Sequence, residues 1–305
     1  MFRLARRCIF NADLPLRNAR VAVVGLGLMG GSLAMALTQW SLCQEVVGVA
    51  RREETLREAR GCEVAHRVTT DLVDGITGAD VIVLATPVRT IIRQLHHLTA
   101  MPLGSCLLMD LGSTKTEIVA AMEELPAHVQ PVGAHPMCGK ETSGLAAAEP
   151  TLYEGAPWVL TPLPRTSPAA LALARELAVA VGARPLVMHP DRHDRLVAAI
   201  SHLPYSLAVA LMLAVAEIGY EDELVWELAA SGFRDSSRLA ASDVTMMLDI
   251  LITNPVAVGE LLRRASVHLE RLADLLATGD EDELHTLLVA AHDRRTPMFR
   301  HAERG

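Results

Sequence analysis

The chain has 305 residues, of which half are hydrophobic and only 3% aromatic, and its formal net charge is −8 at pH 7. This length suffices for two domains, and the acidic balance gives no electrostatic support for a nucleic-acid partner. The 5 cysteines lack CxxC pairs and zinc-ligand spacing, so we expect no metal site and a reducing, cytoplasmic compartment. The longest apolar stretch, Ser206 to Ala216, is too short to span a membrane. We interpret it as a buried helix at a helix–helix interface.

A glycine-rich loop follows the first predicted strand. We expect an arm over residues 1–19, a buried strand over 20–24 and a helix over 30–42, with Gly25-Leu26-Gly27-Leu28-Met29-Gly30 between strand and helix. Glycines permit a tight turn and close approach of a pyrophosphate, and a helix N-terminus offers free N–H groups. A second strand at 46–49 stands at the expected distance, so the loop predicts a dinucleotide site. Its expected contacts are Gly25, Gly27, Leu28, Met29 and Gly30.

The end of the second strand, Val49-Ala50-Arg51-Arg52, indicates which dinucleotide binds. NAD sites usually place an Asp or Glu here to accept hydrogen bonds from the ribose hydroxyls. This chain has two guanidinium groups instead, and arginine pairs with a phosphate in a bidentate manner. We therefore predict NADP as the preferred cofactor, held by Arg51 and Arg52. NAD is the alternative, because Glu53 can still reach a ribose.

Strands and helices continue to alternate up to residue 189. Strands are predicted at 81–85, 107–111, 132–134, 158–161 and 185–188, and helices at 88–98, 114–125 and 168–181. Thr114 and Glu117 have capping-box spacing at one helix start. The alternation predicts an α/β fold with a Rossmann-type, doubly wound parallel sheet. Ligands bind at the carboxyl edge of such a sheet, so Thr86 and Pro87, which end one strand, are expected to contact the cofactor.

Ser113 and His135 follow two further strands at the same edge. Ser113 either hydrogen-bonds a substrate hydroxyl or the nicotinamide, or it only caps a turn and the helix that follows. His135 precedes Pro136, which favours an extended backbone. An imidazole with a pKa near neutrality can take a proton while a hydride leaves carbon. A lone histidine is more often structural, but beside a dinucleotide loop it predicts oxidation of an alcohol.

After residue 189 the strand signals stop. Apolar periodicity typical of helices covers 190–219, 221–230, 243–252, 255–277 and 281–293. The pair Asn254-Pro255 has the order of a helix cap followed by a first-turn proline. We predict three parts: an N-terminal arm over 1–19, a dinucleotide-binding Rossmann domain over 20–189, and an all-α domain over 190–305.

Two polar segments interrupt this apolar helical part. One contains His202 and Tyr205 and opens a long helix. The other places Arg234 and Arg238 four residues apart, on one face if it is helical. Two arginines facing a cleft suit a substrate that carries carboxylates. The alternative is that Arg234 and its neighbour Asp235 form a surface ion pair.

Six segments, taken in order, resemble the prephenate/arogenate dehydrogenase family of tyrosine biosynthesis. They are GLGLMGGS (25–32), DLGSTK (110–115), GAHPMCGKETSG (133–144), APWVLTP (156–162), SHLP (201–204) and GFRDSSRLA (232–240). The resemblance runs from about Val21 to the helices near residue 275. It implies that the all-α domain is a dimerisation domain and that the chain forms a homodimer. It also implies oxidative decarboxylation of prephenate to 4-hydroxyphenylpyruvate, with hydride transfer to NAD(P).

The resemblance further implies roles for individual residues. His135 falls on the catalytic histidine that bonds the ring hydroxyl, and Ser113 on the serine that assists that hydroxyl and the nicotinamide. Arg238 falls on the arginine that grips the ring carboxylate, with Arg234 and Asp235 near the entrance to the site. His202 belongs to the SHLP segment, and we place it with Tyr205 among the substrate contacts.

The sequence leaves alternatives open for the substrate and for the class of reaction. Prephenate-specific relatives often carry a second histidine at the position of Tyr205, so an arogenate dehydrogenase that gives tyrosine directly is one alternative. A β-hydroxyacid dehydrogenase shares the domain plan but relies on a catalytic lysine on a helix. A non-catalytic dinucleotide-binding sensor needs the glycine loop, but has no reason to keep His135, Ser113 and Arg238 together.

Overall fold

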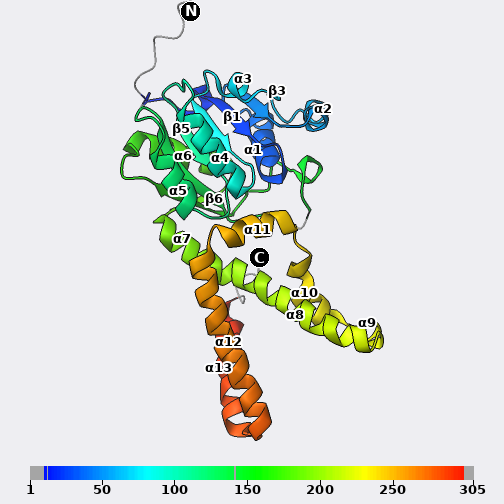
Figure 1. Ribbon diagram of the computed structural model, residues 1–305. Coiled ribbons are helices and arrows are strands. Elements are labelled where there is room, and N and C mark those ends of the chain that lie inside the picture. The colour runs from blue at the N-terminus through cyan, green and yellow to red at the C-terminus, as the bar shows by residue number, and fades with distance from the viewer. Residues whose placement is uncertain (1–9, 12, 141, 299–305) are drawn as a thin grey trace, which may run out of the picture. The chain divides into compact units, whose positions relative to one another are not determined.

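The computed structural model describes residues 10–11, 13–140 and 142–298, and the chain divides into two compact units, Met1–Pro255 and Val256–Gly305. Residues 1–9 and 12 of the predicted arm lie outside the described residues. The first unit contains an eight-stranded sheet of order β3-β2-β1-β4-β5-β6-β7-β8 (Figure 1). Its strands are β1 (Arg20–Val24), β2 (Glu45–Val49), β3 (Arg67–Thr69), β4 (Val81–Leu84), β5 (Leu107–Asp110), β6 (Gln130–Pro136), β7 (Pro157–Pro162) and β8 (Arg184–Val187).

The direction of the strands confirms a doubly wound sheet with one departure from parallel order. Strands β1 to β6 are parallel to their neighbours, and the order reverses beside β1, where dinucleotides bind in such sheets. Strand β7, however, is antiparallel to β6. Over the described residues of the connection, 137–140 and 142–156, only a short 3-10 turn at Leu145–Ala147 stands in place of a crossover helix. The chain therefore re-enters the sheet at the edge where β6 ends.

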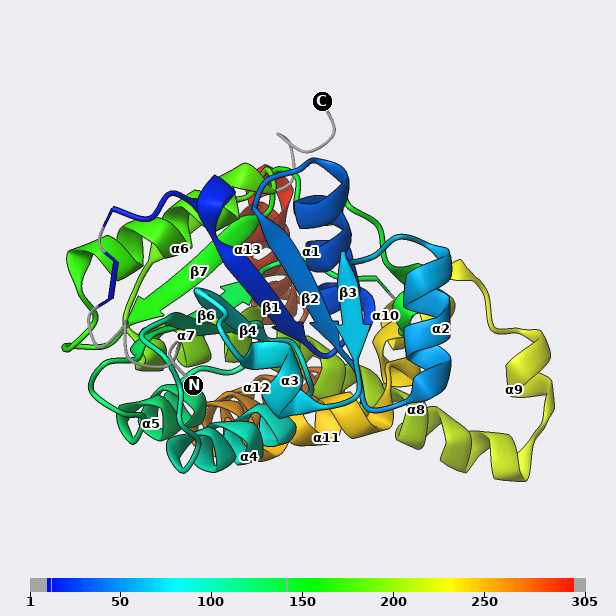
Figure 2. The same cartoon turned by 90° about the horizontal axis from the view of Figure 1, so that it is seen from above.

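Helices cover both faces of the sheet. Figure 2 shows α1 and α6 on one face and α3, α4 and α5 on the other. They are α1 (Leu28–Gln39), α2 (Glu53–Gly61), α3 (Leu72–Ile76), α4 (Val88–Thr99), α5 (Thr116–Glu123) and α6 (Pro168–Ala180). Along β1, Val21 and Val23 join the core beneath α1 and α6, whereas Ala22 and Val24 join the core of the other face. Both faces of β1 are thus buried, which explains its uninterrupted apolar sequence.

The start of α5 differs from the predicted capping box. The helix begins at Thr116, and its N-terminal residues receive no side-chain cap from Thr114. The Thr114 hydroxyl bonds the Thr253 hydroxyl at 2.8 Å instead. The N–H groups of Lys115 and Thr116 donate to the carboxylate of Asp194, which is distant in sequence. The capping-box prediction is wrong because a tertiary partner satisfies these N–H groups.

The first unit continues through a mainly helical segment. Its elements are α7 (Pro190–Val197), a π-helical turn (Ala198–His202), α8 (Leu203–Glu221), α9 (Leu224–Glu227), α10 (Ser231–Ser237), a 3-10 turn (Arg238–Ala241) and α11 (Val244–Ile252). The expected burial of the apolar α8 is wrong for the single chain: Leu213 is 63% exposed and Ile218 54% exposed. By length and composition, the run Pro190–Glu221 is one helix able to cross a membrane.

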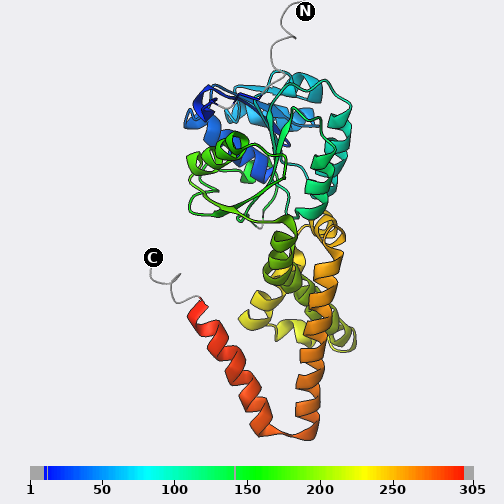
Figure 3. The ribbon, with the colours of Figure 1, turned by 90° about the vertical axis from the view of Figure 1, so that its left-hand side faces the viewer.

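The second unit is a helical hairpin, made by α12 (Pro255–Thr278) and α13 (Glu281–Met298). The reversal contains Gly279, whose φ of +68° favours glycine. Figure 3 shows the two helices diverging from this turn. Arg271 forms an ion pair with Glu283 next to the reversal. Helix α13 has no buried residue among those described, so its faces are open to a further partner.

Candidate functional site

The glycine loop between β1 and α1 has the geometry of a phosphate cradle. Gly25 has a φ of +105°, and a Cβ on Gly30 would lie 1.9 Å from the carbonyl oxygen of Gly25, so these two residues close the turn. A Cβ on Gly27 would meet nothing within 4 Å. Helix α1 starts at Leu28 with no side-chain cap and no acidic residue in its first turn. Its first N–H groups are therefore available to an anion, and the open side of Gly27 lets a pyrophosphate approach the backbone.

The end of β2 beside this loop is basic. Arg51 and Arg52 are exposed, and no described residue forms an ion pair or side-chain hydrogen bond with either. Glu53 is the first residue of α2 and is engaged by Arg60, with Oε1 3.0 Å from Nη1. The edge thus offers two free guanidinium groups and one partly neutralised carboxylate. Guanidinium groups of this kind can pair with an anionic group of a ligand.

Thr86 and Pro87 lie at the end of β4, next to the glycine loop. A Cβ on Gly25 would lie 2.8 Å from Cγ2 of Thr86, so the two loops are in van der Waals contact. The Thr86 hydroxyl donates to Oε1 of Gln94 at 2.8 Å. Pro87 precedes the first residue of α4 with extended backbone. Both residues therefore lie at the edge of the sheet where the cofactor was expected.

His135 lies on β6, half-buried, and its ring is held by a second histidine. Its Nδ1 is 2.8 Å from Nε2 of His193, and the two rings meet edge to face. Burial, with a contribution from the charge of Lys115, holds the pKa of His135 well below its usual range. The imidazole is consequently neutral near pH 7, which is the state that accepts a proton.

A buried ion pair ties the strand of His135 to the loop of Ser113. Asp110 and Lys115 bond each other, and both side chains are fully buried. Lys115 Nζ donates to the carbonyl of Ala134 at 2.7 Å, and the N–H of Ala134 donates to Asp110 at 2.9 Å. The peptide before His135 is thereby clamped from both sides. Because the Lys115 ammonium group bonds Asp110 and the carbonyl of Ala134, it is not free to act as a catalytic lysine on a substrate.

Ser113 occupies the exposed side of the same loop. Its hydroxyl is half-buried and makes no hydrogen bond with any described residue. The N–H of the preceding Gly112 donates to Asp110 at 2.7 Å, so the backbone around Ser113 is fixed while its side chain is not. A fixed backbone with an unengaged hydroxyl is suited to hydrogen bonding a ligand.

His202 joins the same network through the helical segment. Asn254 Nδ2 donates to the carbonyl of Asp194 at 2.8 Å and lies 3.3 Å from Nδ1 of His202. Burial lowers the pKa of His202 to about 4. The structure therefore brings His202, Asp194 and His135 into one connected cluster. Tyr205, one turn further along α8, is half-buried and makes no hydrogen bond with a described side chain.

The arginines of the second polar segment lie on a separate element. Arg234 on α10 is 3.4 Å from Oδ1 of Asp235, and both side chains are exposed. This is the surface ion pair that the sequence left as an alternative. Arg238 begins the 3-10 turn that packs against α8. Arg234 lies in α10 and Arg238 in the turn that follows it, so the two arginines do not share one α-helix, and their roles toward a substrate rest on the resemblance.

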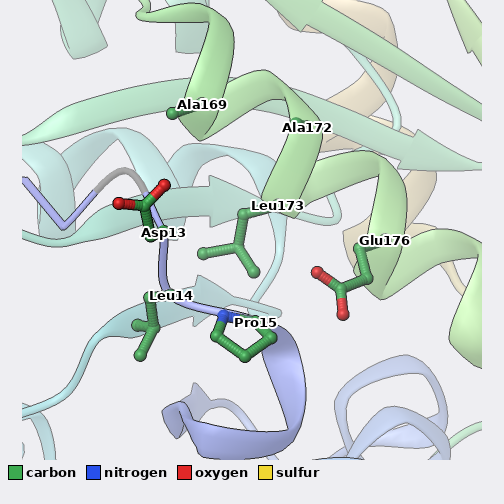
Figure 4. Close-up of a pocket in the computed structure, with 7 residues that line it drawn as sticks. All are labelled: Asp13, Leu14, Pro15, Ala169, Ala172, Leu173 and Glu176. Atoms are coloured by element: carbon green, nitrogen blue, oxygen red, sulfur yellow. The ribbon is translucent and has the colours of Figure 1, made fainter.

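The hollow in Figure 4 is not part of this cluster. It has a volume of about 250 Å³ and lies between Asp13–Pro15 of the arm and Ala169, Ala172, Leu173 and Glu176 of α6. The arm leads into the amino end of β1, and α6 starts where the antiparallel β7 ends. Both are therefore at the amino edge of the sheet, opposite the glycine loop and His135. Ligands of doubly wound sheets bind at the carboxyl edge.

Sequence reasoning missed the residues that support His135. His193 and Asp194 lie 58 or more residues away from their partners His135 and Lys115, and Asn254 lies 60 residues away from its partner Asp194. No periodic pattern in the sequence indicates that these residues belong to the site. The polar sequence of α7, PDRHDRLV, gave no sign that the imidazole of His193 and the carboxylate of Asp194 would be buried and would need partners.

Comparisons with known proteins match this arrangement. The family model described as the prephenate dehydrogenase nucleotide-binding domain matches residues 33–187, and the one described as the prephenate dehydrogenase dimerization domain matches residues 189–290. A prephenate dehydrogenase of Lactococcus lactis is 33% identical over 258 residues, which cover 83% of this chain and 70% of that protein.

Two solved structures have the same fold along most of their length. The Synechocystis arogenate dehydrogenase is 32% identical, with a TM-score of 0.78, and covers 91% of this chain and 99% of its own. The Aquifex aeolicus prephenate dehydrogenase in complex with hydroxyphenyl propionate and NAD+ is 28% identical, with a TM-score of 0.82. That match covers 94% of this chain and 99% of the Aquifex chain.

Proposed function

This chain belongs to the prephenate dehydrogenase family, and we propose that it oxidises and decarboxylates prephenate to 4-hydroxyphenylpyruvate in tyrosine biosynthesis. One observation carries the proposal: His135, a neutral imidazole held by His193, lies at the same sheet edge as the open glycine loop. A hydride acceptor and a proton acceptor on one edge are what oxidation of a ring carbinol requires.

In the reaction, His135 takes the proton of the ring hydroxyl while the carbinol carbon loses its hydride. A nicotinamide dinucleotide, when bound, accepts that hydride. The new carbonyl draws the electrons of the breaking carbon–carboxylate bond into the ring, so carbon dioxide leaves and the ring becomes aromatic. The ring oxygen then takes a proton back from His135 and becomes the phenol hydroxyl. The Ser113 hydroxyl, which has no partner among the described residues, would hydrogen-bond the same oxygen and, with the dinucleotide bound, its nicotinamide. A positioned general base of this kind contributes roughly 10²–10⁴ in rate.

Arg238 is proposed to bind the ring carboxylate, with Arg234 and Asp235 at the entrance and His202 and Tyr205 near the substrate. The support is the position of these residues in the family segments SHLP and GFRDSSRLA, together with the packing of the Arg238 turn on α8. A guanidinium pairs with a carboxylate in a bidentate manner, which fixes the ring as well as holding it.

Arogenate is the second candidate substrate. Tyr205 stands where prephenate-specific relatives often carry a histidine, and the similar Synechocystis structure is an arogenate dehydrogenase. The two substrates differ in a keto or an amino group on the side chain. The residue at position 205 therefore bears on the choice only if it faces that side chain.

NADP is the cofactor we propose, with NAD as the alternative. The support is the pair of unengaged guanidinium groups at the end of β2 and the ion pair that occupies Glu53. NAD remains the alternative because the similar Aquifex structure contains NAD+. An assay matrix of prephenate and arogenate against NAD+ and NADP+ tests all four combinations in one experiment. Dinucleotide reduction with neither substrate would contradict the proposed function.

A homodimer through the helical region is also proposed, with the domain boundary near residue 189. Supporting observations are the extent of the dimerization-domain match from residue 189 and the exposed leucines and isoleucines of α8. A second copy that covers this face would remove from water the apolar surface that the single chain leaves open. A cytoplasmic location agrees with the four described cysteines, which are all free thiols.

A further inference from the structure

A chain of hydrogen bonds leads from His135 into the helical segment. Nδ1 of His135 is 2.8 Å from Nε2 of His193, and Nδ1 of His193 is 2.7 Å from Oδ1 of Asp194. The side chains of His193 and Asp194 are buried. Asp194 Oδ1 also accepts the N–H of Lys115, and Oδ2 accepts the N–H of Thr116. Two of the three partners of the Asp194 side chain are therefore backbone donors, one on each carboxylate oxygen.

These partners fix the position of each proton in the chain. Burial opposes ionisation of Asp194, but the hydrogen bonds from His193, Thr116 and Lys115 lower its pKa, so it is a carboxylate. A carboxylate only accepts hydrogen bonds, so Nδ1 of His193 carries a proton. In a neutral imidazole the other nitrogen is then an acceptor. Nδ1 of His135 must donate to it, and the lone pair of His135 lies on Nε2.

We propose that His193 is a positioning residue that sets the tautomer of His135, holding it with a proton on Nδ1 and a free lone pair on Nε2. This inference rests on the proposed role of His135 as proton acceptor. If His193 donated instead, His135 would carry its proton on Nε2 and present no base to the substrate. The Asp194 carboxylate determines the proton positions on both histidines, because it accepts the proton of His193. The same carboxylate caps α5 just after the loop of Ser113. One buried group thus orients both the base and the serine loop.

Nitrogen-15 NMR of the imidazole side chains tests the proposal on the unaltered full chain near pH 7. We expect His135 and His193 both to carry their proton on Nδ1, with Nε2 of each showing the shift of an unprotonated nitrogen. The His135 signals are assigned by their loss in His135→Asn. A proton on Nε2 of His135 would overturn the proposal, and this measurement does not depend on whether any variant of His193 folds.

Two variants of His193 separate positioning from packing. His193→Gln places an amide oxygen where Nε2 was and can still accept from His135. His193→Leu has similar bulk but offers no acceptor. We expect kcat of the leucine variant to fall by on the order of 10², with the glutamine variant restored to within about tenfold of wild type and KM for the substrate little changed in both. A folded leucine variant with wild-type kcat would refute the positioning role.

Failure of this inference is distinguishable from failure of the proposed function. If His135→Asn keeps wild-type turnover, His135 is not the base and the proposed function loses its main support, whatever the tautomer. If His135→Asn is inactive while wild-type His135 carries its proton on Nε2, only the tautomer inference fails. Melting temperatures of all variants, measured alongside, report whether each one is folded.

Discussion

Two alanine substitutions in the glycine loop should have opposite consequences. A Cβ on Gly27 would meet nothing within 4 Å, and its φ of −95° is open to any residue. A Cβ on Gly30 would lie 1.9 Å from a backbone oxygen of Gly25, and neither group can move without opening the turn. Gly27→Ala is thus expected to fold normally and lose cofactor affinity, whereas Gly30→Ala is expected to lose stability.

The magnitudes follow from the same geometry. For Gly27→Ala, the gain from a less flexible unfolded chain, about 0.4–1 kcal/mol, offsets the poorer helix-capping ability of alanine. The free energy of unfolding should change by less than about 1 kcal/mol. For Gly30→Ala, overpacking typically costs about 1–3 kcal/mol, and contact with backbone puts the cost at the upper end. Loss of one or two phosphate contacts at about 1.5–3 kcal/mol each should weaken dinucleotide binding by tenfold or more in Gly27→Ala.

The assay pairs urea unfolding of the cofactor-free chain with dinucleotide titration of the folded chain. The two variants are each other's control, because they add the same methyl group three residues apart. Wild-type dinucleotide affinity in Gly27→Ala would show that the pyrophosphate does not approach this backbone. An unchanged free energy of unfolding in Gly30→Ala would contradict the close contact with Gly25.

Three further predictions address substrate, cofactor and pH. Arg238→Ala should raise the KM for the substrate about tenfold or more, because a contact with its carboxylate is lost. The surface variant Arg264→Ala is the control, and steady-state kinetics that show no change in KM would refute the contact. Ala50→Asp combined with Arg51→Ala should shift the ratio of kcat/KM values from NADP toward NAD, and a wild type that strongly prefers NAD would contradict the role of Arg51. Because burial lowers the pKa of His202 from 6.5 to about 4, the unfolded chain binds the proton first as pH falls. The free energy of unfolding therefore falls between about pH 6.5 and 4, by up to about 3 kcal/mol from this group. Urea unfolding of His202→Asn over the same pH range should show a smaller fall. An equal fall in the variant would exclude His202 as its source.

The sequence predicted what local patterns encode. Strands β1 and β4 are uninterrupted apolar runs buried on both faces, and the glycine spacing marks the turn between β1 and α1. Element α2 was missed because its sequence EETLREARG is mostly polar, with Leu56 and Ala59 alone buried. Strand β3 was missed because its three residues lie half-buried at the sheet edge, with little apolar signal.

The site depended on contacts that no local pattern carries. Asp110 and Lys115 were recognised as part of a motif, but their clamp on Ala134 depends on β5 and β6 being neighbours. His193 and Asp194 support His135 and α5 across 58 and 79 residues of sequence. Strand β7 is antiparallel to β6, and the described residues of the connection before it form no crossover helix, which the pattern of strands alone did not distinguish.

The turnover of His135→Asn relative to wild type tests the central claim most directly. Asparagine places an amide near the position of Nδ1 and can keep the contact with His193, but it cannot take up a proton. We expect kcat with prephenate and the preferred dinucleotide to fall by roughly 10²–10⁴, with dinucleotide affinity unchanged. A variant that oxidises prephenate at the wild-type rate would contradict the assignment of His135 as the proton acceptor.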